Sequence, residues 1–420
     1  MRGERMIIRE NYLKKLRRYR DNGDIKVITG VRRCGKTCLL KQLMEELKES
    51  GVSDENIIYL NFESARYAFI GDTNDLNEYV FKTAQGLSGK IYLLFDEIQQ
   101  IKYWEKSINA FRVDLDCDIY ITGSNSTLLA GELATLLTGR YITIDIYPFS
   151  YNELLAYYSS KKHSNMPISS KEPVLTREEE LKIFNDYMKF GGFPGLLKYE
   201  DEDKEHYLKD LFNSILFRDI LSKSKISDID LLERIIDFVI SNIGQIISSN
   251  SISNYLKHEN RTSPKTVINY LNVITKAFIF YKIKREDIIG KKKLNVLEKY
   301  YLVDPGFYYI FNYQASGGIG QLLENIVFLE LKRRNYSISI GRIKDLEVDF
   351  VCRKANETVY IQVSASILDE NTREREMKSL LKIRDNYPKY VLTLDDFDLS
   401  YNGIKHLNIL DFLKDENSLL

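Results

Sequence analysis

The sequence has few cysteines for its 420 residues. They are Cys34, Cys38, Cys117 and Cys352, and no second Cys/His pair accompanies the one close pair. A structural zinc site needs four such ligands, and a disulfide framework needs paired cysteines at regular spacings. The sequence therefore predicts neither. Reduced thiols are typical of a cytoplasmic protein.

Long apolar runs are also lacking. No stretch of about 18 apolar residues occurs, so no membrane-spanning helix is expected. The N-terminal segment is basic and amphipathic and lacks the apolar core of a signal peptide. We therefore expect a cytoplasmic protein with no membrane partner.

The chain has no net charge of either sign. Its 60 Lys and Arg residues balance 60 Asp and Glu residues, so any surface for nucleic acid must be local. With 44% hydrophobic and 29% charged residues, the composition is typical of a folded, soluble protein. The length predicts two to four domains.

The first third of the chain alternates short apolar runs with segments of helical spacing. The expected strands are Ile25–Thr29, Ile57–Phe62, Ile91–Phe95, Asp118–Thr122 and Tyr141–Ile146. The expected helices are Lys36–Leu47, Trp104–Leu115 and Ser126–Leu137. This alternation indicates an α/β fold with a mostly parallel sheet, whose strands are buried on both faces.

A phosphate-binding motif follows the first expected strand. Residues 30–37 match the P-loop pattern G-x-x-x-x-G-K-[ST], which predicts ATP and Mg²⁺ as ligands. Backbone N–H groups and the start of the next helix would face the phosphates. Lys36 would bind the β- and γ-phosphates, and the Thr37 hydroxyl would bind Mg²⁺. The expected nucleotide contacts are Gly30, Val31, Arg32, Arg33, Cys34, Gly35, Lys36, Thr37 and Cys38. The alternative is an ordinary Gly-rich strand–helix turn.

A second motif is an apolar strand that ends in two acids, Asp96 and Glu97. A carboxylate at the end of such a strand can hold Mg²⁺ through water, which is the role expected of Asp96. Glu97 is the candidate base that orients or deprotonates the attacking water. The alternative is an acidic cap between a strand and a helix.

Two further residues are catalytic candidates by position. Asn125 follows the strand Asp118–Thr122 and is a candidate sensor of the γ-phosphate, with Ser124 as its competitor. Alternatively, Ser124, Asn125 or Ser126 only caps the next helix. Arg140 precedes the last strand and is a candidate arginine finger toward a neighbouring subunit. The alternative for Arg140 is a solvated or ion-paired side chain.

At this point the chain resembles prokaryotic AAA+-type ATPases that carry an archaeal-ATPase-like P-loop domain and a C-terminal DUF4143-type domain. The segments that carry the resemblance are Ile28–Thr37, Leu93–Gln99, Ile121–Leu129, Leu137–Glu153, Gly191–Leu197, Asp210–Leu221 and Gly320–Val363. The resemblance implies an ASCE-type core, with an extra strand between the P-loop strand and the strand of Asp96. It implies the same roles for Lys36, Thr37, Asp96 and Glu97.

The predicted domains are a P-loop ATPase domain at 1–160, a linker and helical lid at 161–222, a winged-helix-like domain at 223–312 and a nuclease-like α/β domain at 313–420. The polar segment Lys161–Pro173 is expected to be a linker or loop. Helical spacing predicts helices at Glu178–Lys189 and Asp203–Ser222, and throughout Leu231–Ala277.

Within the winged-helix-like domain, Ser251–Leu256 and Pro264–Tyr270 are expected to be short helices joined by a polar turn. Such a unit places its second helix in the major groove of DNA. The candidate phosphate contacts are Arg261, Lys265 and Lys291–Lys293. The alternative is a fold used only for packing or for protein contacts.

The last hundred residues are similar to restriction-endonuclease domains. Glu324, Asp349 and Gln362 occupy the places of the acidic motif, on an expected helix and the hairpin Val348–Cys352 and Thr358–Val363. Ser364 stands where the motif has its lysine, although a lysine from elsewhere in the chain would be able to replace it. We therefore expect a nuclease-like fold without nuclease activity, and leave open whether Glu324 and Asp349 bind a metal.

The sequence thus predicts an ATPase that couples Mg-ATP binding and hydrolysis to a DNA or protein partner. One alternative is a nucleotide-regulated binding module with little turnover, and another is an ATP-dependent nuclease. An arginine finger at Arg140 acting between subunits would require a homo-oligomer.

Overall fold

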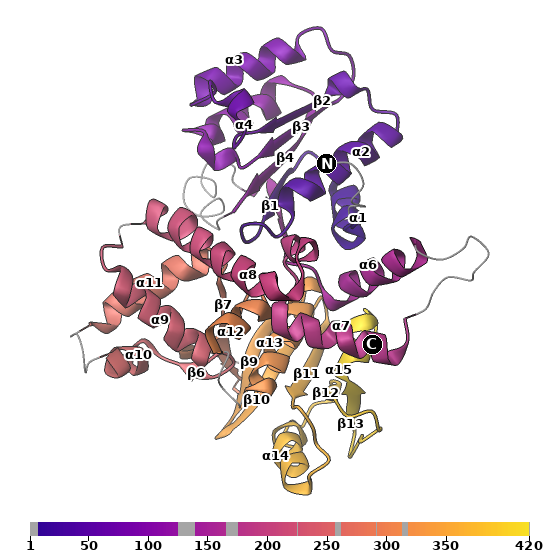
Figure 1. The fold of residues 1–420 in the computed structure, drawn as a ribbon, viewed down its shortest axis with the longest axis vertical. Coiled ribbons are helices and arrows are strands. Elements are labelled where there is room, and N and C mark those ends of the chain that lie inside the picture. Colours follow the sequence, from indigo (N-terminus) through magenta and orange to yellow (C-terminus); the bar gives the residue numbers. More distant parts are fainter. Residues whose placement is uncertain are drawn as a thin grey trace. The chain divides into compact units, whose positions relative to one another are not determined.

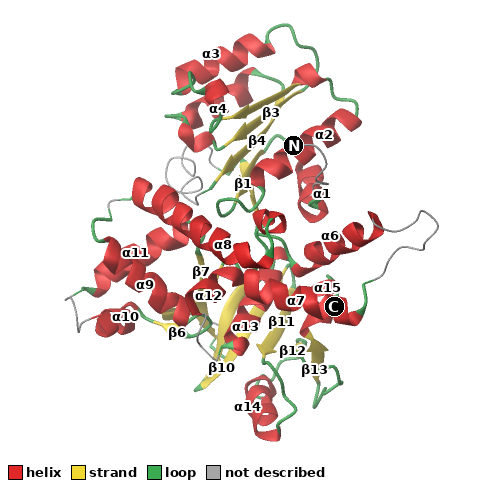
Figure 2. Ribbon diagram, in the orientation of Figure 1, coloured by secondary structure: helices red, strands yellow, loops and turns green. Residues whose placement is uncertain are grey.

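The computed structural model describes residues 7–124, 139–164, 175–224, 226–256, 262–290, 292–312 and 318–419. The chain forms two compact units (Figures 1 and 2). The first comprises Met1–Pro148 with Lys276–Phe278, and the second comprises Phe149–Thr275 with Ile279–Leu420.

The first unit is built on a five-stranded sheet in the order β2-β3-β4-β1-β5. The strands are β1 (Ile25–Thr29), β2 (Ile57–Asn61), β3 (Ile91–Asp96), β4 (Cys117–Gly123) and β5 (Tyr141–Asp145). Every neighbouring pair is parallel. β4 lies between the P-loop strand β1 and the strand of Asp96, β3, which confirms the ASCE-type order.

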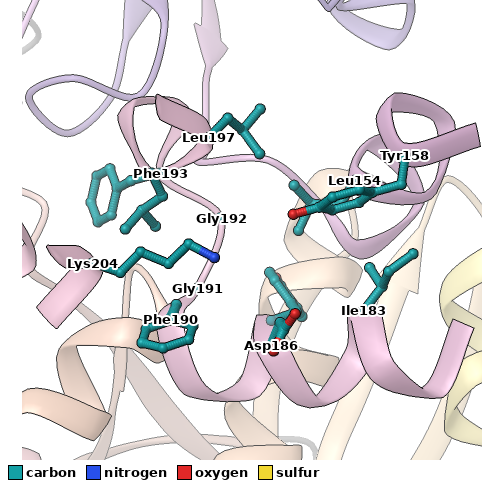
Figure 3. A pocket seen from close by; sticks show the side chains of 12 residues that line it. Leu154, Tyr158, Ile183, Asp186, Phe190, Gly191, Gly192, Phe193, Leu197 and Lys204 are labelled. Carbon is teal, nitrogen blue, oxygen red and sulfur yellow. The ribbon is translucent and has the colours of Figure 1, made fainter. Parts of the chain in front are cut away.

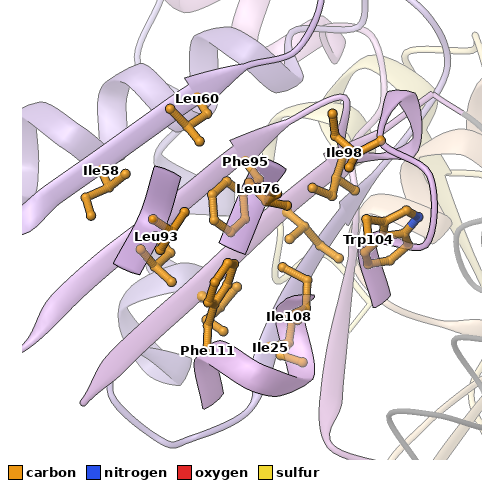
Figure 4. Close-up of a cluster of buried hydrophobic side chains, with 14 of the residues drawn as sticks. Ile25, Ile58, Leu60, Leu76, Leu93, Phe95, Ile98, Trp104, Ile108 and Phe111 are labelled. Carbon is orange, nitrogen blue, oxygen red and sulfur yellow. The ribbon is translucent and has the colours of Figure 1, made fainter. Parts of the chain in front are cut away.

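Helices flank this sheet. They are α1 (Glu10–Tyr19), α2 (Lys36–Glu49), α3 (Thr73–Ala84) and α4 (Trp104–Asp114). Leu76 of α3 and Phe111 of α4 pack on the face of the sheet that carries Phe95 (Figure 4). Phe95 and Phe111 have ring centroids 6.0 Å apart. Each such buried side chain contributes roughly 1.5–3 kcal/mol, which explains the continuous apolar runs of the strands.

The structure describes two of the predicted connecting segments only in part or not at all. The predicted helix Ser126–Leu137 lies outside the described residues. The predicted linker Lys161–Pro173 begins too early, because helix α6 (Tyr151–Ser164) includes residues 161–164. Residues 165–173 lie outside the described part of the chain.

The second unit contains an eight-stranded mixed sheet in the order β13-β12-β11-β10-β9-β7-β8-β6. Its strands are β6 (Ile246–Ile247), β7 (Phe280–Asp287), β8 (Lys292–Leu302), β9 (Ser337–Ile343), β10 (Leu346–Lys354), β11 (Glu357–Val363), β12 (Lys389–Thr393) and β13 (Ile404–Asn408). β10 and β11 form the predicted antiparallel hairpin. β7 pairs in parallel with β9, so one continuous sheet runs through regions that the sequence assigned to separate domains.

The helices of the second unit are α6, α7 (Arg177–Phe190), α8 (Asp201–Ile215), α9 (Ile229–Ser241), α10 (Ser249–Leu256), α11 (Pro264–Lys276), α12 (Pro305–Asn312), α13 (Ile319–Arg333), α14 (Glu370–Leu381) and α15 (Ile409–Lys414). Thr176 and Glu179 form a capping box that starts α7. The predicted helix Asp203–Ser222 is α8 followed by a π turn, Leu216–Ile220. The prediction of helix throughout Leu231–Ala277 was wrong at residues 246–247, which form β6.

A glycine-rich turn follows α7 and crosses other backbone closely. A Cβ added at Gly192 would lie 2.1 Å from the carbonyl oxygen of Phe149, and one at Gly306 would lie 2.2 Å from that of Phe190. The buried Asp304 carboxylate accepts hydrogen bonds from the N–H groups of Gly192 (2.8 Å) and Gly306 (2.9 Å). Only glycine fits these crossings, so the Gly191–Gly195 motif is a packing feature of the second unit.

Candidate functional site

The phosphate-binding motif forms the turn between β1 and α2. A Cβ at Gly30 would lie 2.3 Å from the carbonyl oxygen of Ile146, so the loop passes directly against the end of β5. Gly35 has a φ of 108°, which side chains rarely adopt, and Arg33 has a φ of 63°. This conformation leads directly into the first turn of α2, where unpaired N–H groups favour an anion.

Lys36 is buried at the first position of α2. Its Nζ donates hydrogen bonds to the carbonyl oxygens of Gly30 (3.0 Å) and Val31 (3.2 Å). It also lies 3.7 Å from Glu97 Oε1. The charge of Lys36 is thus held within the loop, next to the candidate base.

Asp96 ends β3 and is fully buried. Its Oδ2 accepts a hydrogen bond from Thr37 Oγ1 at 2.7 Å, and its Oδ1 accepts one from Thr122 Oγ1 at 2.6 Å. Burial raises the pKa of Asp96, and the two hydroxyl hydrogen bonds oppose that rise. The structure therefore brings together the two predicted Mg²⁺ ligands, Thr37 and Asp96.

Glu97 turns sharply out of β3 with a left-handed backbone (φ 56°, ψ 48°). Its N–H donates to Thr122 Oγ1 at 2.9 Å. One carboxylate oxygen, Oε2, accepts a hydrogen bond from Gln99, and the other faces Lys36. A residue other than Gly in this backbone region costs about 1–3 kcal/mol and persists only where its surroundings enforce it. Here the Thr122 hydroxyl does so.

Three polar residues at this site were missed by the sequence interpretation. Tyr59, in the middle of β2, and Asn61, its last residue, donate hydrogen bonds to Asp96 Oδ2 at 3.2 and 3.1 Å. Thr122, near the end of β4, bridges Asp96 and the Glu97 N–H. The position of polar residues near the carboxyl ends of the predicted strands was the signal that could have identified them, because parallel strands bring these ends together at one edge of the sheet.

The other predicted loop residues differ in exposure. Val31 and Cys34 are fully buried and offer only their backbone to a ligand. Arg32 Nη1 lies 3.3 Å from Glu63 Oε1. Arg33 and Cys38 are exposed.

Of the two sensor candidates, the structure describes only Ser124. Gly123 pairs with Thr29, so the buried Ser124 follows β4 beside the start of the phosphate-binding loop. Asn125 lies outside the described residues.

Arg140 is exposed and precedes β5. Its carbonyl accepts a hydrogen bond from the Ile25 N–H, at the beginning of β1. The phosphate-binding loop follows the opposite end of β1, five residues further, which is roughly 16 Å along a strand. Arg140 is therefore remote from the P-loop of its own chain.

In the second unit, the predicted nuclease-like acids surround a lysine from another element. Lys299 of β8 is buried, and its Nζ lies 2.9 Å from Glu324 Oε1, 2.8 Å from Glu347 Oε1 and 3.7 Å from Asp349 Oδ1. Tyr301 also donates to Glu324 Oε1, at 2.7 Å. Burial and the neighbouring Glu324 raise the pKa of Asp349, with Lys299 opposing them.

Gln362 is turned toward protein groups. Its Oε1 accepts from the Asp349 N–H at 3.3 Å, and its Nε2 donates to Glu376 Oε2 at 3.0 Å. The Ser364 hydroxyl donates to the Ser366 carbonyl oxygen. Within the described part of the chain, no cluster of three or more His, Cys, Asp or Glu side chains is arranged to hold a metal ion.

The second unit also contains a pocket between α6, α7 and the glycine-rich turn (Figure 3). It has about 360 Å³ of empty space, part of it open solvent. Leu154, Tyr158, Phe190 and Phe193 give it an apolar wall, and Asp186 and Lys204 supply its charged groups. All of the residues that line this pocket belong to the second unit.

The sheet order and the loop between β1 and α2 define a P-loop ATPase fold. A family model described as an AAA domain matches residues 22–155. The Walker-type ATPase PABY2304 of Pyrococcus abyssi has a similar fold, with a TM-score of 0.50 and 17% identity over 73% of this chain and 96% of that chain.

Models of two domains of unknown function match later parts of the chain, DUF8612 at residues 181–314 and DUF4143 at residues 319–412. An uncharacterized protein of Haemophilus influenzae is 40% identical over 97% of this chain and 98% of its own length. Uncharacterized protein MJ1544 of Methanocaldococcus jannaschii is 33% identical over 89% of this chain and 82% of its own. The chain belongs to this family of P-loop proteins, which joins an N-terminal AAA domain to a C-terminal DUF4143 domain and confirms the resemblance.

None of the helices in the described residues has the length and apolarity needed to cross a membrane.

Proposed function

We propose that the chain is an ATPase in which Mg-ATP binding and hydrolysis in the first unit change how the second unit engages a DNA or protein partner. The observation that carries the proposal is the position of Glu97. Its carboxylate lies 3.7 Å from the P-loop lysine, and its N–H shares the Thr122 hydroxyl with Asp96. A base is thus held beside the group that binds the γ-phosphate.

The residues of the loop fit a Mg-nucleotide. Hydroxyl and carboxylate oxygens are ligands that Mg²⁺ accepts, and those of Thr37 and Asp96 lie 2.7 Å apart. Bound there, Mg²⁺ would neutralise charge on the β- and γ-phosphates. Lys36 would exchange its contacts with the loop carbonyls for phosphate oxygens.

Hydrolysis requires a water molecule oriented by Glu97. The Glu97 carboxylate would accept a hydrogen bond from that water, or its proton, while Lys36 stabilises charge on the phosphoryl group. Ser124 and Asn125 remain the sensor candidates.

Steady-state phosphate release tests the ATPase part. Lys36→Ala should reduce turnover to background, whereas Lys41→Ala, an exposed lysine of the same helix, should leave it unchanged. Equal background turnover in wild type and Lys36→Ala would refute the ATPase proposal.

For the partner, the second unit contains the succession α9-β6-α10-α11-β7-β8, with β8 paired antiparallel to both β6 and β7. This succession supports the winged-helix interpretation. One side of α11 is buried and consists of Val267, Tyr270, Leu271 and Ile274. Lys265, near the start of the helix, is exposed. Arg261 and Lys291 lie outside the described residues.

Fluorescence anisotropy with duplex DNA at 50 and 200 mM salt tests the DNA part. Lys265→Ala should weaken binding and lower the salt slope by about one. Lys378→Ala, an exposed lysine of α14, is the control. Absence of binding at low salt would exclude DNA.

A protein partner is the second candidate, because two large apolar side chains are exposed near the same turn. Tyr255 is 65% exposed and Ile268 is 46% exposed. In that case the chain is a nucleotide-regulated binding module, and Mg-ATP would raise the unfolding temperature by mass action even where turnover is low. No shift with Mg-ATP would contradict both candidates.

An ATP-dependent nuclease is the remaining alternative. Lys299 is a lysine from elsewhere in the chain that lies among these acids, but its Nζ pairs with the carboxylates that a metal ion would need, which argues against this activity. Plasmid nicking with Mg²⁺ or Mn²⁺ is the test, and genuine activity would be lost in Asp349→Ala.

A further inference from the structure

The residue before α1 is buried against the phosphate-binding loop. Arg9 is 3% exposed, and its two terminal nitrogens reach different parts of the first unit. Nη1 donates to the Cys34 carbonyl oxygen at 3.1 Å, and Nη2 donates to the Tyr147 carbonyl oxygen at 3.0 Å. The planar fork of arginine can bind two carbonyls at once, whereas the ammonium of lysine acts as a single point of charge.

The first contact constrains a peptide of the P-loop. In a planar trans peptide the C=O and the following N–H point in opposite directions. By holding the Cys34 carbonyl, Arg9 turns the Gly35 N–H away from itself, and N–H groups of this loop are the ones that bind phosphate. The flanking Arg33 and Gly35 have φ angles of 63° and 108°, conformations that need support from their surroundings.

The second contact lies where the chain leaves the first unit. Tyr147 follows β5, and Pro148 is the last residue of this part of the unit. The Tyr147 N–H donates to Tyr12 Oη at 3.2 Å, so both backbone groups of Tyr147 are held by side chains near the start of α1. The neighbouring Ile146 N–H donates to the Thr29 carbonyl oxygen at 2.7 Å, just before the loop begins.

The helix that follows the loop holds Arg9 in place. Gln42 of α2 accepts a hydrogen bond from the Arg9 N–H at 3.0 Å and donates one to the Ile7 carbonyl oxygen at 2.6 Å. The guanidinium lies 4.6 Å from the centre of the Tyr12 ring, within range of a cation–π interaction. Arg9 is thus fixed from both its backbone and its side chain.

We propose that Arg9 is a positioning residue for the ATPase reaction: it sets the phosphate-binding conformation of the loop and links that conformation to Tyr147, where the chain leaves the unit. This inference rests on the proposed function, since it needs a nucleotide at residues 30–37. A shift of the Cys34–Gly35 peptide on phosphate binding moves the carbonyl that Arg9 holds, and the same guanidinium carries the change to the end of β5.

The affinity for mant-labelled Mg-ADP tests the first part. Arg9→Lys should weaken binding about ten-fold or more, because one charge-assisted hydrogen bond is lost. Arg9→Ala should weaken it further and regain part of the loss in millimolar guanidinium ion. Arg17→Lys is the matched control, because Arg17 also bridges α1 and α2, through Glu46 at 2.8 Å, without touching the loop. The affinity of the Arg17→Lys variant for mant-labelled Mg-ADP should stay within about two-fold of the wild-type value.

Amide hydrogen exchange tests the link to Tyr147. In wild type, Mg-ADP should slow exchange in residues 30–37 and at Ile146 and Tyr147. In Arg9→Lys saturated with Mg-ADP, protection of the loop should remain while protection of Ile146 and Tyr147 is lost. If Arg9→Lys bound Mg-ADP as tightly as wild type, or protected the loop and Ile146 and Tyr147 as in wild type, the role of Arg9 would be refuted. The proposed ATPase function would not be affected by either result. A wild-type chain that binds no Mg-ADP would contradict the proposed function as well.

Discussion

At the scale of single residues, Thr122 connects the two motif acids. Its hydroxyl donates to Asp96 Oδ1 and accepts the Glu97 N–H, so one oxygen orients a carboxylate and a strained backbone turn. A buried donor or acceptor left without a partner costs about 1–3 kcal/mol. Thr122 is therefore placed to affect turnover through Asp96 and Glu97.

We expect Thr122→Val to lower kcat at least ten-fold while the affinity for ATP changes little, because Glu97 loses the contact that fixes its turn. Thr122→Ser should recover most of the activity. Thr83→Val, an exposed threonine of α3, is the control. Phosphate release under saturating ATP is the measurement, and an unchanged kcat in Thr122→Val would show that the hydroxyl has no part in catalysis.

Asp304 is a buried carboxyl group of the second unit with a raised pKa. Burial raises its pKa from 3.8 to about 7, although two backbone N–H groups favour the carboxylate. The folded state thus binds this proton more tightly than the unfolded chain does. The stability contributed by the protonated form is fully present below pH 4 and is lost as the pH rises toward 7.

Between pH 4 and 7, the wild-type free energy of unfolding should therefore fall relative to that of Asp304→Asn, with a slope of up to about 1.4 kcal/mol per pH unit. Urea unfolding at several pH values measures the difference between the two proteins. A difference that stays constant across this range would contradict the raised pKa of Asp304.

At the scale of secondary-structure elements, Lys299 joins three parts of the second unit. It belongs to β8. Its side chain contacts Glu324 of α13 and both Glu347 and Asp349 of β10. Removing one partner of such a buried cluster leaves charges without compensation, which typically costs about 3–5 kcal/mol. The cluster therefore acts as a structural connection between the β7–β8 hairpin and the elements α13 and β10.

Lys299→Met should lower the free energy of unfolding by about 3–5 kcal/mol. Lys282→Met is a matched control on the same hairpin, because Lys282 is partly exposed and pairs with Glu298 at 3.4 Å. That change should cost less than about 1 kcal/mol. Equal effects of the two substitutions in chemical denaturation would show that the buried cluster is not a structural connection.

Sequence periodicity predicted the strands of the first unit to within one residue at each end. β1, β3 and β4 are buried along their length and read as continuous apolar runs, but the expectation of burial on both faces was wrong for the edge strands β2 and β5, which are only partly buried. Helix α3 was missed, although Asp72 caps it and Leu76, Val80 and Ala84 form its buried stripe. Strand β6 was not predictable, since two residues carry no period. The contacts of Tyr59 and Thr122 with Asp96 depend on strand order, and those of Lys299 depend on tertiary packing, so neither follows from local pattern.

At the scale of the whole molecule, the position of Arg140 bears on assembly. It precedes β5, roughly 16 Å along the sheet from the loop that follows β1, so it would reach a phosphate only in another copy of the chain. An arginine finger acting between subunits remains a prediction.

Mixing two inactive variants tests it. Arg140→Ala and Lys36→Ala should each lose turnover alone. If a dimer exchanges subunits freely, an equimolar mixture should recover roughly one quarter of wild-type activity, because half of the dimers are mixed and each has one intact site. Arg112→Ala, on α4, is a control that should stay active alone. No recovery on mixing would contradict a role of Arg140 between subunits.

We propose that Glu97 is the base of the ATPase site. The most direct measurement is the ratio of ATP to ADP bound after a single turnover, followed by rapid quench in wild type, Glu97→Gln and the exposed control Glu78→Gln. We expect wild type and Glu78→Gln to hold ADP, and Glu97→Gln to bind ATP with similar affinity and to retain it unhydrolysed. Hydrolysis by Glu97→Gln at the wild-type rate would contradict this proposal.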